Sequence, residues 1–103
     1  MLIHLGNQSQ FENVIKEGVV LVDFFATWCG PCKMLSPELE KLAEDDKDIN
    51  VVKVDIDEFN QLAAEYDVRA VPTLILFKDG KPVSKGMGFK PLQSLKQFVN
   101  QAK

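Results

Sequence analysis

The feature that most limits the possible folds is an apolar run of seven residues, Val19 to Phe25, broken only by Asp23. A strand with one face in water alternates apolar and polar residues, whereas an apolar run of this length is typical of a strand covered on both faces. The run therefore predicts the central strand of a sheet that has helices packed against each side.

Helical and strand patterns alternate along the first half of the chain. Ser9 and Glu12 have the spacing of a capping box that opens a helix, and Gly18 ends that helix before the central strand. Leucines then recur at helical spacing from Cys29 to Glu44, and Val51 to Ile56 predicts a second buried strand. This order of strands and helices implies parallel pairing with right-handed crossovers.

The second half of the chain adds a hairpin between two helices. Residues 59–66 trace one face of a short helix, and Thr73 to Phe77 forms a third apolar run. Asp79 and Gly80 then give a hairpin turn, so the next strand should be antiparallel. Pro91 opens a last helix in its first turn. The pattern as a whole predicts an α/β protein, a mixed sheet with helices on both faces.

Composition restricts the classes of function. A chain of 103 residues with 46% hydrophobic content can close one core, so we expect residues 1–103 to form a single domain. A formal net charge of -3 offers no basic field for nucleic acid or an anionic membrane. Without a bilayer-spanning apolar run or a signal-like start, the expected compartment is the cytoplasm. There, a cysteine pair more often serves redox or metal chemistry than crosslinking.

Both cysteines lie in one tetrapeptide, Cys29-Gly30-Pro31-Cys32, between the central strand and the following helix. A cysteine at a helix N-terminus meets free backbone amides and the positive end of the helix dipole, which favour the nucleophilic thiolate. We expect Cys29 to be the exposed attacking group and Cys32, one turn into the helix, to be partly shielded and to resolve the mixed disulfide. Pro31 limits backbone freedom, and Gly30 leaves room for a partner.

Two other uses of the cysteines are less consistent with the sequence. A structural disulfide that closes so short a ring would contribute only about 2 kcal/mol through loop-closure entropy, and a cytosol would tend to reduce it. A zinc site needs about four ligands, and the only histidine is His4. A lone Cys-x-x-Cys in a strand-helix pattern instead matches a redox motif, so we expect no metal.

Three further residues are interpreted here from the sequence alone. Asp23 inside the apolar run is either a buried carboxyl of raised pKa or a solvated aspartate at a strand end. Lys53, taken alone, is best interpreted as a solvated lysine. Pro72, taken alone, marks a strand edge, and about 95% of X-Pro bonds in folded proteins are trans.

The segment Val22 to Met34, which contains Trp28 and the two cysteines, resembles the active-site segment of the thioredoxin family. Lys53 to Asp57 resembles the third strand of that family, and Val71 to Gly80 resembles its cis-proline loop and hairpin. The resemblance implies the thioredoxin fold, a central mixed five-stranded sheet flanked by four helices. The chain departs from the family pattern at Phe25, where many members carry a second tryptophan, and at Ala70, where glycine is frequent.

The resemblance also implies roles for individual residues. Asp23 would relay a proton to or from Cys32, with Lys53 as its partner. The Val71–Pro72 bond would be cis, and the backbone beside it would pair with a bound substrate strand. The implied substrate-binding residues are Trp28, Gly30, Pro31, Ile56, Val71, Pro72, Thr73, Met87 and Gly88. From the residues alone, Ile56 and Met87 are equally consistent with core packing, and Gly88 with a loop residue of positive φ.

The activity implied by the resemblance is that of a general protein-disulfide reductase, recharged by thioredoxin reductase and NADPH, with disulfide-containing proteins as clients. The chain has no nucleotide-binding glycine pattern, so we expect no bound cofactor other than the Cys29–Cys32 disulfide itself. A monomer is the simplest expectation. An oxidant or isomerase is disfavoured by Gly30 and Pro31, and a docking module that binds partners without turnover is an alternative from a different class.

Overall fold

The computed structural model describes all 103 residues and contains a five-stranded sheet in the order β1-β3-β2-β4-β5. The strands are Leu2–His4 (β1), Val19–Phe25 (β2), Ile49–Asp55 (β3), Thr73–Lys78 (β4) and Lys81–Met87 (β5). β3 pairs in parallel with β1 and β2, whereas β4 pairs antiparallel with β2 and β5. The predicted mixed sheet is confirmed, and the seven-residue apolar run is its central strand.

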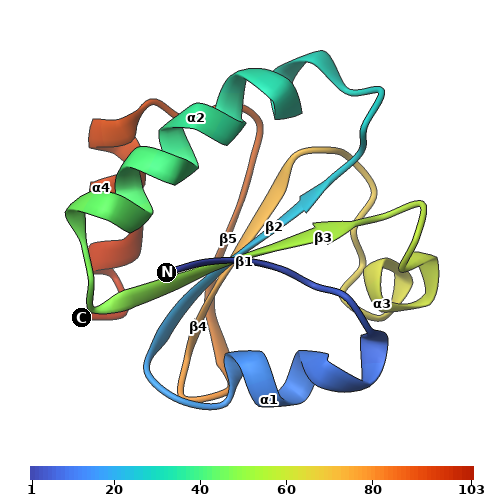
Figure 1. Cartoon of the computed structure of the whole chain (residues 1–103), viewed down its shortest axis with the longest axis horizontal. Coiled ribbons are helices and arrows are strands. Elements are labelled where there is room, and N and C mark those ends of the chain that lie inside the picture. Colours follow the sequence, from blue (N-terminus) through green and yellow to red (C-terminus); the bar gives the residue numbers. More distant parts are fainter.

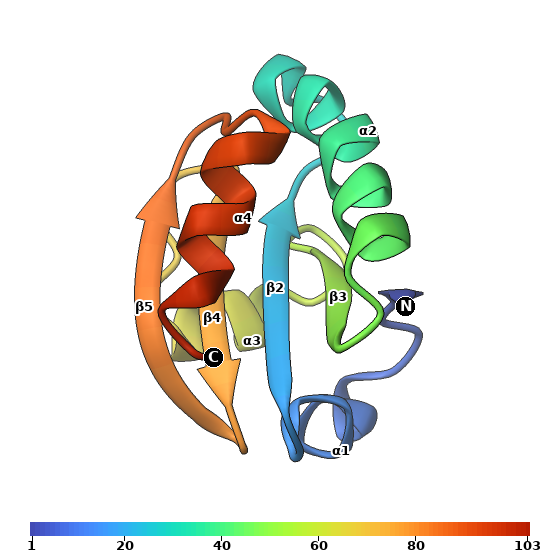
Figure 2. The same ribbon diagram turned by 90° about the vertical axis from the view of Figure 1, so that its left-hand side faces the viewer.

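Helices cover both faces of this sheet (Figure 1). On one face lie α1 (Phe11–Ile15), preceded by the 3-10 helix η1 (Gln8–Gln10), and α3 (Asn60–Glu65). On the other face lie α2 (Gly30–Asp45) and α4 (Leu92–Asn100), which run side by side in front of the strands (Figure 2). None of these helices has both the length and the hydropathy that crossing a bilayer requires.

β2 is buried because its side chains enter two separate cores. Val20, Val22 and Phe24 belong to the core beneath α1 and α3, whereas Val19 and Leu21 belong to the core beneath α2 and α4. Side chains alternate between the faces of a strand, so Asp23 and Phe25 share the face of Leu21 and point toward α2. The central strand therefore carries a carboxyl into the layer that α2 covers.

Several predicted boundaries are wrong. The capping box does not form, because Asn7 is the N-cap of η1 and its side chain accepts a hydrogen bond from the Ser9 backbone N–H at 2.9 Å. The second buried strand is Ile49–Asp55, since its pairing with β2 begins opposite Val19, and it ends before Ile56. Pro91 has extended backbone and is the N-cap of α4 rather than part of its first turn.

The predicted hairpin turn is confirmed at Asp79 and Gly80, whose φ angles are 49° and 85°. Two positive φ values in sequence give the turn that matches the twist of an antiparallel pair. Asp79 also ties the hairpin to the start of β2. Its carboxylate accepts a hydrogen bond from the Gly18 N–H at 2.7 Å, and its own N–H donates to the Gly18 carbonyl at 2.9 Å.

We predict that Gly80→Ala lowers the free energy of unfolding by about 1 kcal/mol, because an L side chain at a φ of 85° is strained. The added Cβ would meet only Lys16 backbone atoms at 3.8 and 3.9 Å, so strain rather than collision sets the loss. Urea unfolding followed by circular dichroism measures it. Gly6→Ala is the control, because φ is not positive there and the added Cβ would meet only Gln10 Oε1, at 4.0 Å. An equal loss in both variants would contradict the prediction.

Candidate active site

The two cysteines lie where the chain leaves the sheet and enters α2. β2 ends at Phe25, and Cys29 is the N-cap of α2, with extended backbone at φ -90° and ψ 116°. Its sulfur accepts a hydrogen bond from the Cys32 backbone N–H at 3.2 Å. Pro31 follows within the first turn, where a missing backbone donor has no helical partner to lose. The predicted strand-to-helix placement of the motif is confirmed.

Cys29 and Cys32 form a disulfide, with 5.3 Å between their Cα atoms. The first turn of α2 contains no acidic residue, so no side-chain charge in that turn offsets the positive end of the helix dipole. When the disulfide is reduced, the Cys32 N–H that now donates to Cys29 Sγ can donate to a thiolate there. A charge-assisted hydrogen bond of this kind favours the ionised sulfur. The arrangement can carry out thiol–disulfide exchange.

The prediction that Cys29 is exposed is wrong for this disulfide form, because Cys29 is 5% exposed and Cys32 is 3% exposed. The burial of Cys29 comes from segments remote in sequence. Its Sγ lies 3.6 Å from the Val71 carbonyl oxygen, and Ile56 and Val71 both pack against the cysteine pair. Gly30 and Pro31 are exposed, so the backbone between the two sulfurs faces solvent.

Of the residues predicted to form an apolar rim, Ile56 and Val71 pack against the cysteine pair. Trp28 is 67% exposed, and its indole N–H donates to the Asp57 carboxylate at 2.9 Å. Met87 is 65% exposed, so the interpretation of Met87 as core packing is wrong. Ile56 is half-buried and packs against both the cysteine pair and the core beneath α1 and α3. Trp28, Ile56 and Val71 line one hollow of about 310 Å³, so three of the predicted rim residues lie together.

The loop opposite the cysteines contains the cis Val71–Pro72 bond. Gly88 has a φ of 85° and donates its N–H to the Pro72 carbonyl at 2.9 Å. Thr73 is fully buried and has strand partners on both sides, and its hydroxyl donates to the Ala70 carbonyl at 2.6 Å. The Thr73 side chain thus closes the loop, whereas Val71 packs against the cysteines.

Asp23 is fully buried, and neither of its carboxyl oxygens has a hydrogen-bond partner. Burial raises the pKa of Asp23 to about 7 from an ordinary 3.8, although the Lys53 charge acts in the opposite direction. The solvated interpretation of Asp23 is therefore wrong. A carboxyl with this pKa can accept and return a proton near neutral pH.

Lys53 is the cross-strand neighbour of Asp23, and it is only 8% exposed, so the solvated interpretation of Lys53 is wrong as well. Its ammonium donates to the Ser36 hydroxyl at 2.8 Å and lies 4.7 Å from the centre of the Phe25 ring. Lys53, Ser36 and Cys32 line one cavity of about 210 Å³. The Asp23 carboxyl therefore has no hydrogen-bond partner, while the Lys53 ammonium on the neighbouring strand is bound to Ser36.

Sequence reasoning missed two polar residues of the site, Ser36 and Asp57. Ser36 follows Cys32 by four residues in a predicted helix, so one helical turn places both on the same face. This spacing of four residues is the feature of the sequence that could have identified Ser36. Asp57 follows the end of β3 by two residues, and no pattern connects it with Trp28 before the fold is known.

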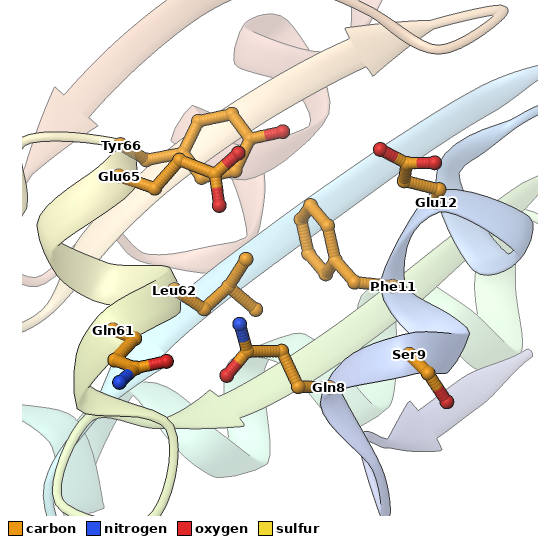
Figure 3. Close-up of a pocket in the computed structure, with 8 residues that line it drawn as sticks. All are labelled: Gln8, Ser9, Phe11, Glu12, Gln61, Leu62, Glu65 and Tyr66. Carbon is orange, nitrogen blue, oxygen red and sulfur yellow. The ribbon is translucent and has the colours of Figure 1, made fainter.

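A larger groove of about 430 Å³ lies elsewhere, between η1–α1 and α3 (Figure 3). It is on the sheet face opposite α2 and contains no cysteine. Its lining residues are Gln8, Ser9, Phe11, Glu12, Gln61, Leu62, Glu65 and Tyr66. No group of three or more histidine, cysteine or acidic side chains is arranged to hold a metal ion. The cysteine pair, and with it the capacity for thiol–disulfide exchange, lies at the start of α2.

Known proteins match the chain along nearly its whole length. The family model described as Thioredoxin matches residues 2–101. A thioredoxin of Staphylococcus saprophyticus is 51% identical over 102 residues, which cover 98% of each chain. Among solved structures, a mutant thioredoxin from Halobacterium salinarum gives a TM-score of 0.92 at 42% identity and covers 98% of this chain and 89% of its own. A thioredoxin from Nicotiana alata gives a TM-score of 0.90 at 34% identity, and the match covers 99% of this chain and 92% of that one.

We predict that Asp23→Ala stabilises the oxidised protein more at pH 8 than at pH 4. The folded-state pKa of Asp23, about 7, lies above the ordinary 3.8, so the native protein is most stable when this carboxyl is protonated and loses stability as the pH rises through 7. Asp23→Ala has no carboxyl at this position, so its stability does not fall in this way as the pH rises. The difference in unfolding free energy should therefore grow by roughly 4 kcal/mol between pH 4 and pH 8.

Urea unfolding of the oxidised proteins at each pH measures this difference. The cavity that the truncation leaves lowers the unfolding free energy equally at both pH values, so it cannot produce a pH-dependent difference. Asp48→Ala, which removes an exposed carboxylate, is the control and should show no comparable growth. A pH-independent difference for Asp23→Ala would mean that the carboxyl ionises as freely in the folded chain as in the unfolded one.

Proposed function

This chain belongs to the thioredoxin family, and from that premise we propose that it is a general protein-disulfide reductase recharged by a flavin-containing thioredoxin reductase and NADPH. Its family, its fold and its cysteine pair make it a dithiol–disulfide oxidoreductase. The observation that best supports disulfide exchange is the position of Cys29, capped by the Cys32 amide at a helix N-terminus without acidic residues, while Gly30 and Pro31 between the cysteines favour a reductant over an oxidant or isomerase. Such a position favours the thiolate that starts reduction.

The proposed cycle begins with the reduced pair. The Cys29 thiolate attacks one sulfur of a client disulfide, so a bond forms between Cys29 Sγ and that sulfur while the client S–S bond breaks. The second client sulfur leaves as a thiolate and takes up a proton. The product of this step is a mixed disulfide between Cys29 and the client.

Cys32 completes the reduction in the second step. Its thiol gives its proton to the Asp23 carboxylate, and its sulfur attacks Cys29 Sγ and releases the remaining client sulfur as a thiolate. The client has gained two electrons, and the Cys29–Cys32 disulfide has re-formed. A tethered attack is effectively unimolecular, which favours it over escape of the mixed disulfide. The pKa of about 7 at Asp23 supports its role as the base.

The apolar rim supports the binding of unfolded or flexible client segments. Trp28 and Met87 expose large apolar side chains, and Gly30 and Pro31, which lie between the two cysteines, are exposed as well. Val71 supplies a backbone carbonyl 3.6 Å from Cys29 Sγ. A client strand that pairs with Val71 would place its sulfur next to Cys29, as in β-augmentation.

The recharging step requires a separate reductase. Thioredoxin reductase would transfer two electrons from NADPH through its flavin to the Cys29–Cys32 disulfide, while this chain binds neither flavin nor NADPH. A protein that gives up electrons in each cycle works where the surroundings keep thiols reduced, so we place it in the cytoplasm. We propose that it acts as a monomer, without nucleic acid or membrane partners.

We predict that the protein, supplied with a bacterial thioredoxin reductase and NADPH, cleaves the disulfides of insulin. NADPH oxidation at 340 nm and insulin precipitation measure the reaction. Cys29→Ser and Cys32→Ser should each abolish it, whereas His4→Ala, a change on β1 away from the cysteines, should leave it unchanged. A docking module would instead keep its partner-dependent activity in both serine variants, and a folded protein without turnover would refute the reductase proposal.

We predict that Cys32→Ser accumulates covalent adducts with disulfide clients, because the mixed disulfide forms at Cys29 and nothing resolves it. Cys29→Ser should capture none. Non-reducing electrophoresis of mixtures with an oxidised client, repeated after dithiothreitol, distinguishes the adducts from other complexes. Adducts in Cys29→Ser alone would assign the attack to Cys32.

A further inference from the structure

One contact below the cysteines has no role in the cycle above. The Lys53 ammonium of β3 donates to the Ser36 hydroxyl of α2 at 2.8 Å and lies 4.7 Å from the centre of the Phe25 ring. Asp23 is paired in register with Lys53 on the adjacent strand, yet both of its carboxyl oxygens have no hydrogen-bond donor. The lysine therefore binds a hydroxyl and an aromatic face while its buried charge partner stays unpaired.

This arrangement differs from what the two charges alone would produce. A buried carboxylate and a buried ammonium on neighbouring strands, directed to the same face of the sheet, attract each other strongly. The lysine side chain is long and flexible, so its ammonium can reach more than one acceptor. The Ser36 hydroxyl is the only hydrogen-bond acceptor that the ammonium has. Removal of the Ser36 hydroxyl would leave the Asp23 carboxylate as the alternative acceptor for the ammonium.

On the basis of the proposed function, we propose that Ser36 is a positioning residue: its hydroxyl, with the Phe25 ring, holds the Lys53 ammonium off the Asp23 carboxyl, which thereby stays available for the Cys32 proton. Ser36 does not touch the reacting sulfurs and acts through Lys53. Its position fits this role, because it lies one helical turn after Cys32 and lines the same cavity of about 210 Å³.

Among the charged groups around Asp23, Lys53 is the one that can pair with its carboxylate. β3 contributes Lys53, whereas β4, on the other side, places apolar Leu74 in register with Asp23. α2 contributes Cys32 and Lys33 to the cavity that Lys53 lines, and β1 places the exposed His4 in register with Lys53. Of these groups, only the Lys53 charge acts on the pKa of Asp23 beside burial.

The test is a titration of Asp23 by ¹³C NMR of its side-chain carboxyl in the oxidised protein. In Ser36→Ala the freed ammonium turns to the carboxylate, so the Asp23 pKa should fall by ~1 unit. Ser36→Thr retains the hydroxyl and should retain the native value. Ser94→Ala, which removes a half-buried serine of α4 that makes no side-chain hydrogen bond, should also leave the value unchanged. An unchanged or raised pKa in Ser36→Ala would overturn the proposal.

A second comparison tests whether Ser36 acts through Lys53. Lys53→Met removes the ammonium, so Ser36→Ala in that background should cause no further shift in the Asp23 pKa. A shift as large as in the native background would show a direct effect of Ser36 and would also overturn the proposal. The midpoint of the rate-versus-pH profile for resolution of the mixed disulfide should move down with the Asp23 pKa in Ser36→Ala.

Failure of this inference is distinguishable from failure of the proposed function. The carboxyl titration needs no client, reductase or turnover, so a native-like titration in Ser36→Ala would remove the role of Ser36 and leave the reductase proposal standing. Conversely, a protein that does not reduce insulin would refute the reductase proposal without moving the titration.

Discussion

The burial of β2 on both faces is the constraint on which the rest of the structure depends. Its alternate side chains enter two cores, and burying each of these apolar side chains contributes roughly 1.5–3 kcal/mol. The strand is therefore held firmly, and so is the point where it ends. From that point the chain must turn into α2, which places Cys29 at the helix N-terminus. The position of the cysteine pair is a consequence of hydrophobic packing at the centre of the sheet.

The same burial imposes an electrostatic cost at Asp23. A carboxyl in the middle of this strand cannot be solvated, and its oxygens have no donor, so it shifts its pKa toward neutrality. Lys53 enters the same layer but binds Ser36 instead. A sequence optimised for stability alone would place an apolar residue at position 23. Local rules of this kind are broken most often where a site performs chemistry.

The sequence pattern predicted those features that depend on local periodicity or turn chemistry. The central strand and the hairpin turn at Asp79 and Gly80 were correct for this reason. The burial of Lys53 could not be predicted in this way, because it depends on the register that pairs Lys53 with Asp23. The burial of Cys29 likewise depends on Val71, which comes from a segment far along the chain. The cis bond before Pro72 was implied only by the resemblance to the family.

Hydrogen bonding, rather than exposure, distinguishes the two cysteines. Cys29 and Cys32 differ by only two percentage points in exposure, 5% against 3%, so accessibility in the disulfide form does not select the attacking sulfur. Their surroundings do differ. Cys29 Sγ accepts a hydrogen bond from the Cys32 N–H at the positive end of α2, whereas Cys32 Sγ accepts none and Cys32 lines the cavity that Ser36 and Lys53 also line. This asymmetry supports the proposed order of the two steps, in which Cys29 attacks the client and Cys32 resolves the mixed disulfide.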